Sequence, residues 1–146
     1  MIHVLGGLMG AAVAGLGGVY LMAPSRKKAS AGWVEAADAS KLATGAAEEV
    51  VFERRRADGW RLTHEKTSAW IVKKSEQEVI AFAPSCTHLG CAFRYEAATK
   101  NFLCPCHVSL FSLDGKVISG PAPRALDQYD VRVENGRVML GEIKKA

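Results

Sequence analysis

Residues 86–91 read Cys-Thr-His-Leu-Gly-Cys, and residues 104–109 read Cys-Pro-Cys-His-Val-Ser. These two blocks hold all four cysteines of the 146-residue chain and two of its four histidines. Each block offers a cysteine and a histidine close together, with one further cysteine. Thiolate and imidazole groups are the usual ligands of zinc, copper and iron–sulfur clusters. The two blocks therefore form a candidate metal centre.

Three arrangements of these side chains are open. A tetrahedral zinc site would take two cysteines and two histidines, but the spacing differs from that of zinc fingers and two cysteines would be left over. Two disulfides would use every thiol and leave the histidines without a role. A [2Fe–2S] cluster bound by two cysteines and two histidines, with one disulfide, uses every residue. We favour this third arrangement.

The two blocks resemble the signature motifs of the Rieske iron–sulfur proteins, and the resemblance extends from about Trp33 to Ile143. The disulfide cysteines and an apolar N-terminal segment are similar to the iron–sulfur subunit of quinol–cytochrome c reductases, the cytochrome bc and b6f complexes. This family implies four cluster ligands, namely Cys86, His88, Cys104 and His107. It also implies a disulfide between Cys91 and Cys106.

The same resemblance assigns roles to residues around the cluster. His107, with His88 beside it, would contact a quinol, and Leu89 would line the docking surface. The Ser109 hydroxyl would donate a hydrogen bond to a bridging sulfide. The loop that covers the cluster in this family corresponds to residues 120–123, which include Gly120, Pro121 and Pro123.

Phe111 departs from the pattern of many high-potential members of this family, which carry a tyrosine there. Because phenylalanine has no hydroxyl to donate to a ligand cysteine, we expect a lower reduction potential, suited to menaquinol. Each neutral histidine that replaces a thiolate removes a negative charge, which raises the potential above that of an all-cysteine cluster. The outer nitrogen of such a histidine can also exchange a proton.

The segment from Ile2 to Ala23 contains no Asp, Glu, Lys or Arg, and every charged residue follows Pro24. As a helix, a segment of this length would extend roughly 33 Å, enough to cross a hydrocarbon core about 30 Å thick. Ala-Ser-Ala at residues 29–31 has the form of a signal-peptide cleavage site. However, the apolar segment is longer than a signal peptide's and no basic region precedes it, so we favour a retained transmembrane helix.

The chain thus divides into an anchor at residues 1–23, a tether at 24–32 and an iron–sulfur domain at 33–146, with a cluster-binding subdomain at about 84–123. The small residues 29–32 favour a flexible tether that lets the domain move.

The basic residues 26–28 follow the apolar segment, which favours a cytoplasmic position for the domain. A disulfide persists only in an oxidising compartment. We give the disulfide more weight and expect a single-pass protein of the plasma membrane with its domain on the outer, periplasmic side. No Arg-Arg pair of a twin-arginine signal precedes the apolar segment.

The domain sequence is typical of antiparallel β-structure. Asn135-Gly136, between two alternating or apolar runs, predicts a tight hairpin. Other short β-prone runs lie at residues 50–52, 69–72 and 79–82. We expect an all-β sandwich or barrel with an inserted cluster-binding subdomain.

Two further segments are not expected to lie inside β-strands. Residues 36–47, rich in Ala, Ser, Thr and Gly, are expected to form a surface segment with one short helix. Glu53 and the three arginines that follow it are expected to end a strand.

The predicted function is that of an electron-transfer subunit. Its expected partners are quinol, a cytochrome b subunit, a c-type cytochrome and membrane lipid, within a dimeric multi-subunit complex. An isoelectric point near 9.0 without a basic groove interleaved with aromatic residues gives no support for nucleic-acid binding. The alternatives are the Rieske small subunit of an oxidase such as arsenite oxidase, and a zinc-stabilised binding module.

Overall fold

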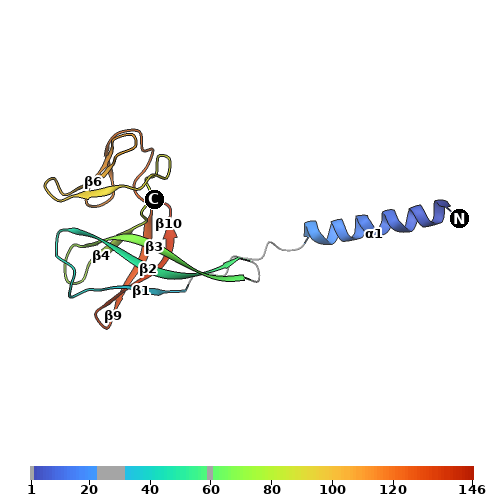
Figure 1. The fold of residues 1–146 in the computed structure, drawn as a ribbon, viewed down its shortest axis with the longest axis horizontal. Helices are drawn as coiled ribbons and strands as arrows, with labels where there is room; N and C mark the ends of the chain where they lie inside the picture. Colours follow the sequence, from blue (N-terminus) through green and yellow to red (C-terminus); the bar gives the residue numbers. More distant parts are fainter. Residues whose placement is uncertain (1, 23–31, 59–60) are drawn as a thin grey trace.

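The computed structural model describes residues 2–22, 32–58 and 61–146 (Figure 1). In chain order, its elements within these ranges are α1 (Ile2–Met22), β1 (Val34–Asp38), β2 (Ala47–Asp58), β3 (Arg61–Lys73), β4 (Val79–Phe82), β5 (Arg94–Glu96), β6 (Asn101–Cys104), β7 (Ser109–Phe111), β8 (Val117–Ser119), β9 (Gln128–Glu134) and β10 (Arg137–Lys144).

Helix α1 occupies almost all of the charge-free N-terminal segment, so the helical conformation expected there is observed. Across the described ranges, no helix has the combination of length and apolar character that crossing a bilayer requires. The membrane span predicted for residues 1–23 is therefore not confirmed. The tether predicted for residues 24–32 lies, apart from Gly32, outside the described residues.

Two antiparallel sheets make up the domain. The larger sheet has the strand order β1-β10-β9-β4-β3-β2, and the smaller has the order β5-β6-β7-β8. All strands of the smaller sheet fall between β4 and β9 in the chain, so it is an insertion into the larger one (Figure 1). This confirms the all-β class and its antiparallel arrangement. The limits given for the subdomain, about 84–123, stay a prediction.

The hairpin predicted at Asn135-Gly136 is present. Glu134 pairs with Arg137 across the two-residue turn between β9 and β10. The φ angles of Asn135 and Gly136 are 49° and 76°. Both are positive, as a turn that matches the twist of its flanking strands requires. Asparagine and glycine are the residues that adopt this conformation at low energetic cost.

The predictions for residues 36–47 and for residues 53–56 were both wrong. Residues 36–47 contain no helix; β1 runs to Asp38 and pairs with β10, while the Leu42 side chain is buried. The long-range pairing with β10 decides this conformation, and local composition gives no sign of it. Residues 53–56 lie within β2, because its ladder with β3 continues to the pair Asp58 and Arg61.

An aromatic core joins the two sheets. The ring centroid of Phe102 on β6 lies 5.5 Å from that of Phe82 on β4 and 5.8 Å from that of Trp70 on β3. Phe111 and Leu126 are fully buried in the same cluster. Burial of each such side chain contributes about 1.5–3 kcal/mol. The smaller sheet, and the loops it carries, are therefore fixed to the larger one.

Candidate metal centre

The two cysteine–histidine blocks lie on neighbouring loops of the inserted region. Residues 86–91 belong to the connection between β4 and β5. The second block forms the turn between β6 and β7, where Cys104 and Ser109 are cross-strand partners. His107 lies within this turn, followed by Val108 with a φ of 57°. The pairing of β6 with β7 thus fixes residues 104–109, whereas residues 86–91 need a cross-link to hold their position.

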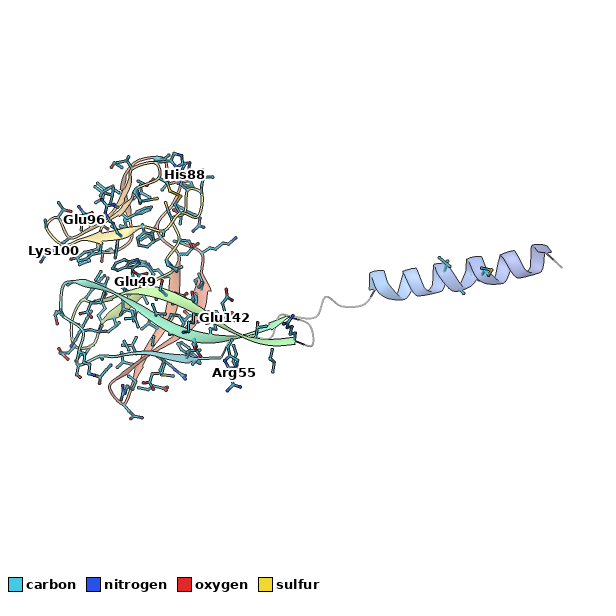
Figure 2. All side chains as sticks on the ribbon, in the orientation of Figure 1. Glu49, Arg55, His88, Glu96, Lys100 and Glu142 are labelled. Carbon is cyan, nitrogen blue, oxygen red and sulfur yellow. A yellow bond between two sulfur atoms is a disulfide. The ribbon has the colours of Figure 1, made fainter. Side chains whose placement is uncertain are left out.

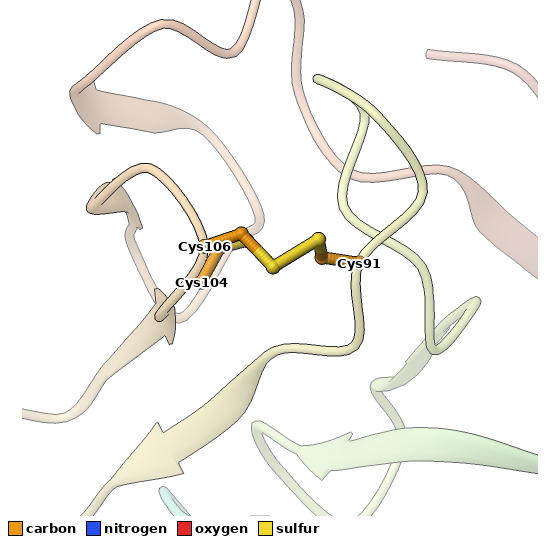
Figure 3. A group of neighbouring side chains, drawn as sticks. All are labelled: Cys91, Cys104 and Cys106. Atoms are coloured by element: carbon orange, nitrogen blue, oxygen red, sulfur yellow. A yellow bond between two sulfur atoms is a disulfide. The ribbon is translucent and has the colours of Figure 1, made fainter.

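A disulfide between Cys91 and Cys106 supplies that cross-link, as the family resemblance implied (Figure 3). Their Cα atoms are 6.6 Å apart. The sulfur atoms of these two residues and of Cys104 all lie within 4.8 Å of one another. Because two of the three sulfurs form the disulfide, only Cys104 in this group has a thiol that can bind a metal.

The remaining two cysteines are free and buried. The exposed fractions of Cys86 and Cys104 are 3% and 2%. Burial raises the pKa of the Cys86 thiol, and its hydrogen bond with the Cys104 side chain raises it further. Hydrogen bonds from the His88 backbone and the Ser109 hydroxyl favour the thiolate and act in the opposite direction. The two thiols are thus in contact, and donors for a charged sulfur are already in place.

The two histidine rings lie together at the same end of the molecule. The ring centroids of His88 and His107 are 4.8 Å apart, with the ring planes at 89°. His88 lies at the extremity of the part built on the smaller sheet (Figure 2). Its Nδ1 atom is buried and has no hydrogen-bond partner among the described residues. Since buried polar atoms are normally satisfied, this nitrogen is suited to a ligand bond.

Backbone hydrogen bonds shape the first loop. The Cys86 N–H donates to the Cys91 carbonyl at 2.8 Å, and the Gly90 N–H donates to the Cys86 carbonyl at 2.9 Å. The Thr87 hydroxyl donates to the Arg124 carbonyl at 2.7 Å. Sequence reasoning missed this last contact, because it joins residues far apart in the chain that carry no metal-binding group.

The loop expected to cover the cluster packs against the second block. Gly120 has a φ of 94°, and a Cβ atom there would lie 2.5 Å from the Ser109 Cα. The Ala122 N–H donates to the Ser109 hydroxyl at 3.2 Å. Pro121 and Pro123 are both exposed. Ser109 thus contacts the cysteine sulfur on one side and this loop on the other.

The remaining predicted site residues differ in burial. Leu89 is 70% exposed, next to the half-buried His88. Phe111 is completely buried in the aromatic core. Val108, which the sequence argument did not single out, is 68% exposed beside His107. The structure therefore brings two exposed apolar side chains into the same loops as the two imidazoles.

Residues 32–130 match the family model described as the Rieske [2Fe-2S] domain. The chain belongs to the Rieske family. It is 34% identical over 123 residues to the "Menaquinol:cytochrome c reductase iron-sulfur subunit" of Geobacillus thermodenitrificans, covering 82% of this chain and 72% of the relative. It is 38% identical over 97 residues to the subunit of the same name in Bacillus subtilis (strain 168), covering 64% and 58%.

A solved structure supports the Rieske fold itself. The ferredoxin of carbazole 1,9a-dioxygenase from Nocardioides aromaticivorans IC177 superimposes with a TM-score of 0.50 at 21% identity. The match covers 74% of this chain and 95% of the ferredoxin. At this identity, the likeness concerns the fold alone.

A Rieske domain implies a [2Fe–2S] cluster as its cofactor. The described residues fit this group: the two free cysteine thiols are buried and hydrogen-bonded to each other, and the two imidazole rings lie together with one buried nitrogen unpaired. This is the mixed cysteine and histidine donor set of such clusters. The assignment of Cys86, His88, Cys104 and His107 as the individual ligands stays a prediction.

Proposed function

We propose that this chain is the electron-transfer subunit of a membrane-bound quinol–cytochrome c reductase. In this proposal it takes an electron, coupled to a proton, from a quinol and delivers the electron to a c-type cytochrome. The observation that carries the proposal is the arrangement of the four predicted ligands. The Cys86 and Cys104 thiols are buried, whereas His107 is exposed at the end of its loop.

The predicted ligands would divide into an inner and an outer pair. Cys86 and Cys104 would bind through their buried sulfurs, and His88 would bind through the unpaired Nδ1. When bound, a [2Fe–2S] cluster of this kind supplies a one-electron carrier at a higher potential than an all-cysteine cluster. Ser109, whose hydroxyl already hydrogen-bonds a ligand sulfur, would tune this potential.

The exposed imidazole of His107 would accept the proton of a quinol hydroxyl at its outer nitrogen, with His88 beside it. Leu89 and Val108, both largely exposed, would contact the apolar quinol or the cytochrome b subunit that holds it. The absence of a tyrosine hydroxyl at Phe111 favours a lower potential and hence menaquinol as the donor. The names of the two relatives agree with this choice.

The proposed location is the outer side of the plasma membrane. The Cys91–Cys106 disulfide supports an oxidising compartment. The charge-free helix α1 supports a single-pass anchor in the lipid, with residues 24–32 as the tether. The partners in this proposal are cytochrome b and a c-type cytochrome in a dimeric, multi-subunit complex.

The test uses the complex purified with the full chain. Replacing the exposed apolar pair, Leu89→Asp with Val108→Asp, should leave the electron paramagnetic resonance signal of the cluster intact. It should lower menaquinol–cytochrome c reductase turnover by at least about tenfold, because carboxylates would replace apolar contacts to the quinol site. Val133→Asp with Ile143→Asp is the matched control, since both are exposed apolar side chains on the larger sheet.

Unchanged turnover in the double variant would contradict the proposed contact of Leu89 and Val108 with the quinol or the cytochrome b subunit. The purified complex should contain b- and c-type haem. Co-purification with a molybdenum enzyme in their place would replace the proposal by that of an oxidase subunit. A preparation with zinc and no cluster signal would exclude both redox roles.

A further inference from the structure

Strands β2 and β3 form a hairpin that continues beyond the sheet (Figure 1). Strand β3 pairs with β4 only over Trp70–Lys73, and β2 ends the strand order of the larger sheet. The distal part of the ladder, from the pair Val51 and Ser68 to the pair Asp58 and Arg61, has no third strand among the described residues. A two-stranded ribbon is only marginally stable in water, so a contact outside the domain would stabilise it.

Exposed basic side chains dominate this ribbon. Arg54 is held by the domain itself, because its guanidinium donates to the Gly141 carbonyl and lies 5.2 Å from the Tyr129 ring centroid. Three other basic residues have no ion-pair or hydrogen-bond partner within the described part of the chain, namely Arg55, Arg61 and Lys66. Leu62, next to Arg61, is 69% exposed. The ribbon thus presents free cations together with an exposed apolar side chain.

The positive charge of the chain is concentrated in two places. Residues 24–32 contain three basic and no acidic residues, and residues 53–66 contain five basic and three acidic ones. The rest of the chain has eleven basic and twelve acidic residues, so it carries no positive excess. The net charge of +4 therefore comes entirely from the tether and the ribbon.

The ribbon also lies where the tether meets the domain. One surface cleft is lined by Gly32 and Trp33 from the start of the domain and by Glu53, Arg55 and His64 from the ribbon. Gly32 directly follows the residues that lead from α1. The start of the domain and the ribbon are thus neighbours, and the basic residues 26–28 precede the start of the domain by only a few positions in the sequence.

We propose that the β2–β3 ribbon is a second membrane contact, which docks on an anionic phospholipid surface. This inference rests on the proposed function, in which α1 anchors the chain in the membrane. Guanidinium groups form strong charge-assisted hydrogen bonds with phosphates. Each basic residue near an anionic surface contributes about 1 kcal/mol, or roughly fivefold in affinity. The exposed Leu62 would enter the interface between head groups and acyl chains. The contact would hold the domain at the membrane until it is released to reach a partner.

The test places the full chain in phosphatidylcholine vesicles with or without phosphatidylglycerol and measures hydrogen–deuterium exchange of residues 51–66. We expect phosphatidylglycerol to slow exchange in the ribbon by at least about tenfold at low salt, and high salt to remove the effect. The triple variant Arg55→Ser, Arg61→Ser and Lys66→Ser should lose this slowing of exchange. The control Lys41→Ser, Lys116→Ser and Lys145→Ser removes equal charge from other exposed positions and should keep it.

Equal exchange in the two kinds of vesicle, or the same loss in both triple variants, would overturn the proposal. Slowed exchange of the ribbon that requires a cytochrome subunit, and not anionic lipid, would also overturn the proposal. The ribbon would then bind an acidic protein surface. Flotation with phosphatidylcholine vesicles tests the anchor separately. A chain that does not float there, yet binds phosphatidylglycerol through the ribbon, would contradict the anchoring while preserving the lipid contact.

Discussion

The Thr87 hydroxyl donates a 2.7 Å hydrogen bond to the carbonyl oxygen of Arg124. Thr87 stands between the predicted ligands Cys86 and His88, whereas Arg124 directly follows the loop at residues 120–123. This one contact joins the first cysteine–histidine loop to the covering loop. The disulfide makes the equivalent connection between the first block and the second. Three loops from distant parts of the chain are thereby held around one site.

Replacement of Thr87 by valine should loosen this arrangement. Thr87→Val keeps the shape of the side chain and removes the hydroxyl, so we expect a loss of about 1 kcal/mol in the free energy of unfolding. The cluster should also be lost faster on incubation with a chelator. Chemical denaturation and the decay of visible absorption measure the two effects. Thr99→Val is the control and should change neither, because Thr99 is exposed and its side chain has no hydrogen bond to another described residue.

Asp127 makes the covering segment sensitive to acid. The hydrogen bond from Arg124 holds the pKa of the Asp127 carboxyl below its ordinary value, with a further contribution from the Ala146 N–H. A lowered folded-state pKa stabilises the fold above the ordinary carboxyl pKa, and this stabilisation is lost as the pH falls through the folded-state pKa.

Asp127→Asn should therefore unfold at a lower denaturant concentration than the parent protein at neutral pH. The difference should shrink as the pH falls and vanish once the parent carboxyl is protonated. Urea denaturation over a series of pH values measures this. A difference that stays constant down to strongly acidic pH would show that the carboxylate charge does not contribute.

The disulfide should stabilise the domain mainly through the unfolded chain. Cys91 and Cys106 are 15 residues apart, and closing a loop of this length is worth about 3 kcal/mol. The double variant Cys91→Ser with Cys106→Ser should lose about this much. A reductant should lower the stability of the parent protein to that of the variant and leave the variant unchanged. Equal stability of parent and variant in the absence of reductant would exclude a stabilising role.

The sequence predicted the chemistry of the site better than its geometry. The residue types of the two blocks, and the family they indicate, were sufficient to predict the Cys91–Cys106 disulfide. The tight turn at residues 135–136 was also predictable, because it depends only on local backbone preferences. In contrast, β1 was missed because its conformation depends on pairing with β10, about a hundred residues later. The Thr87–Arg124 contact, between residues 37 positions apart, is also non-local.

Burial of Ser109 and Phe111 could not be read from the sequence either. Both are completely buried, although residues 105–108 of the preceding turn are exposed. Their burial depends on the covering loop and on the aromatic core, which come from separate parts of the chain. The approach of Gly120 to Ser109 is a consequence of this packing.

Gly120 should tolerate no side chain. Its Cβ would lie 2.5 Å from the Ser109 Cα and 2.8 Å from the Val108 carbonyl oxygen, both backbone atoms that cannot move aside. Gly120→Ala should therefore displace the covering loop and cost at least about 2 kcal/mol of stability, with faster loss of the cluster.

Gly45→Ala is the matched control for backbone strain. Gly45 has a φ of 77°, but a Cβ atom at this position would meet no other atom within 4 Å. The substitution should cost only about 1 kcal/mol and leave the cluster unaffected. Thermal unfolding and visible spectroscopy compare the two variants. A loss at position 120 no larger than at position 45 would show that the close contact with Ser109 is unimportant.

Phe111 offers the most direct test of how the protein sets the potential of its cluster. It lies on β7 two residues after Ser109 and is fully buried. Phe111→Tyr adds a hydroxyl where many high-potential members of the family have one. A new hydrogen bond worth about 1 kcal/mol more in the reduced state corresponds to a rise of roughly 40 mV in a one-electron potential. Redox titration followed by electron paramagnetic resonance measures the shift.

Phe52→Tyr is the control, because Phe52 is buried in the separate core of the larger sheet and should leave the potential unchanged. If Phe111→Tyr retains the cluster and shows no upward shift, the phenylalanine does not lower the potential. Phe111 would then give no reason to expect menaquinol as the donor. An upward shift accompanied by slower oxidation of menaquinol and unchanged cytochrome reduction would instead link this one buried side chain to the choice of quinol.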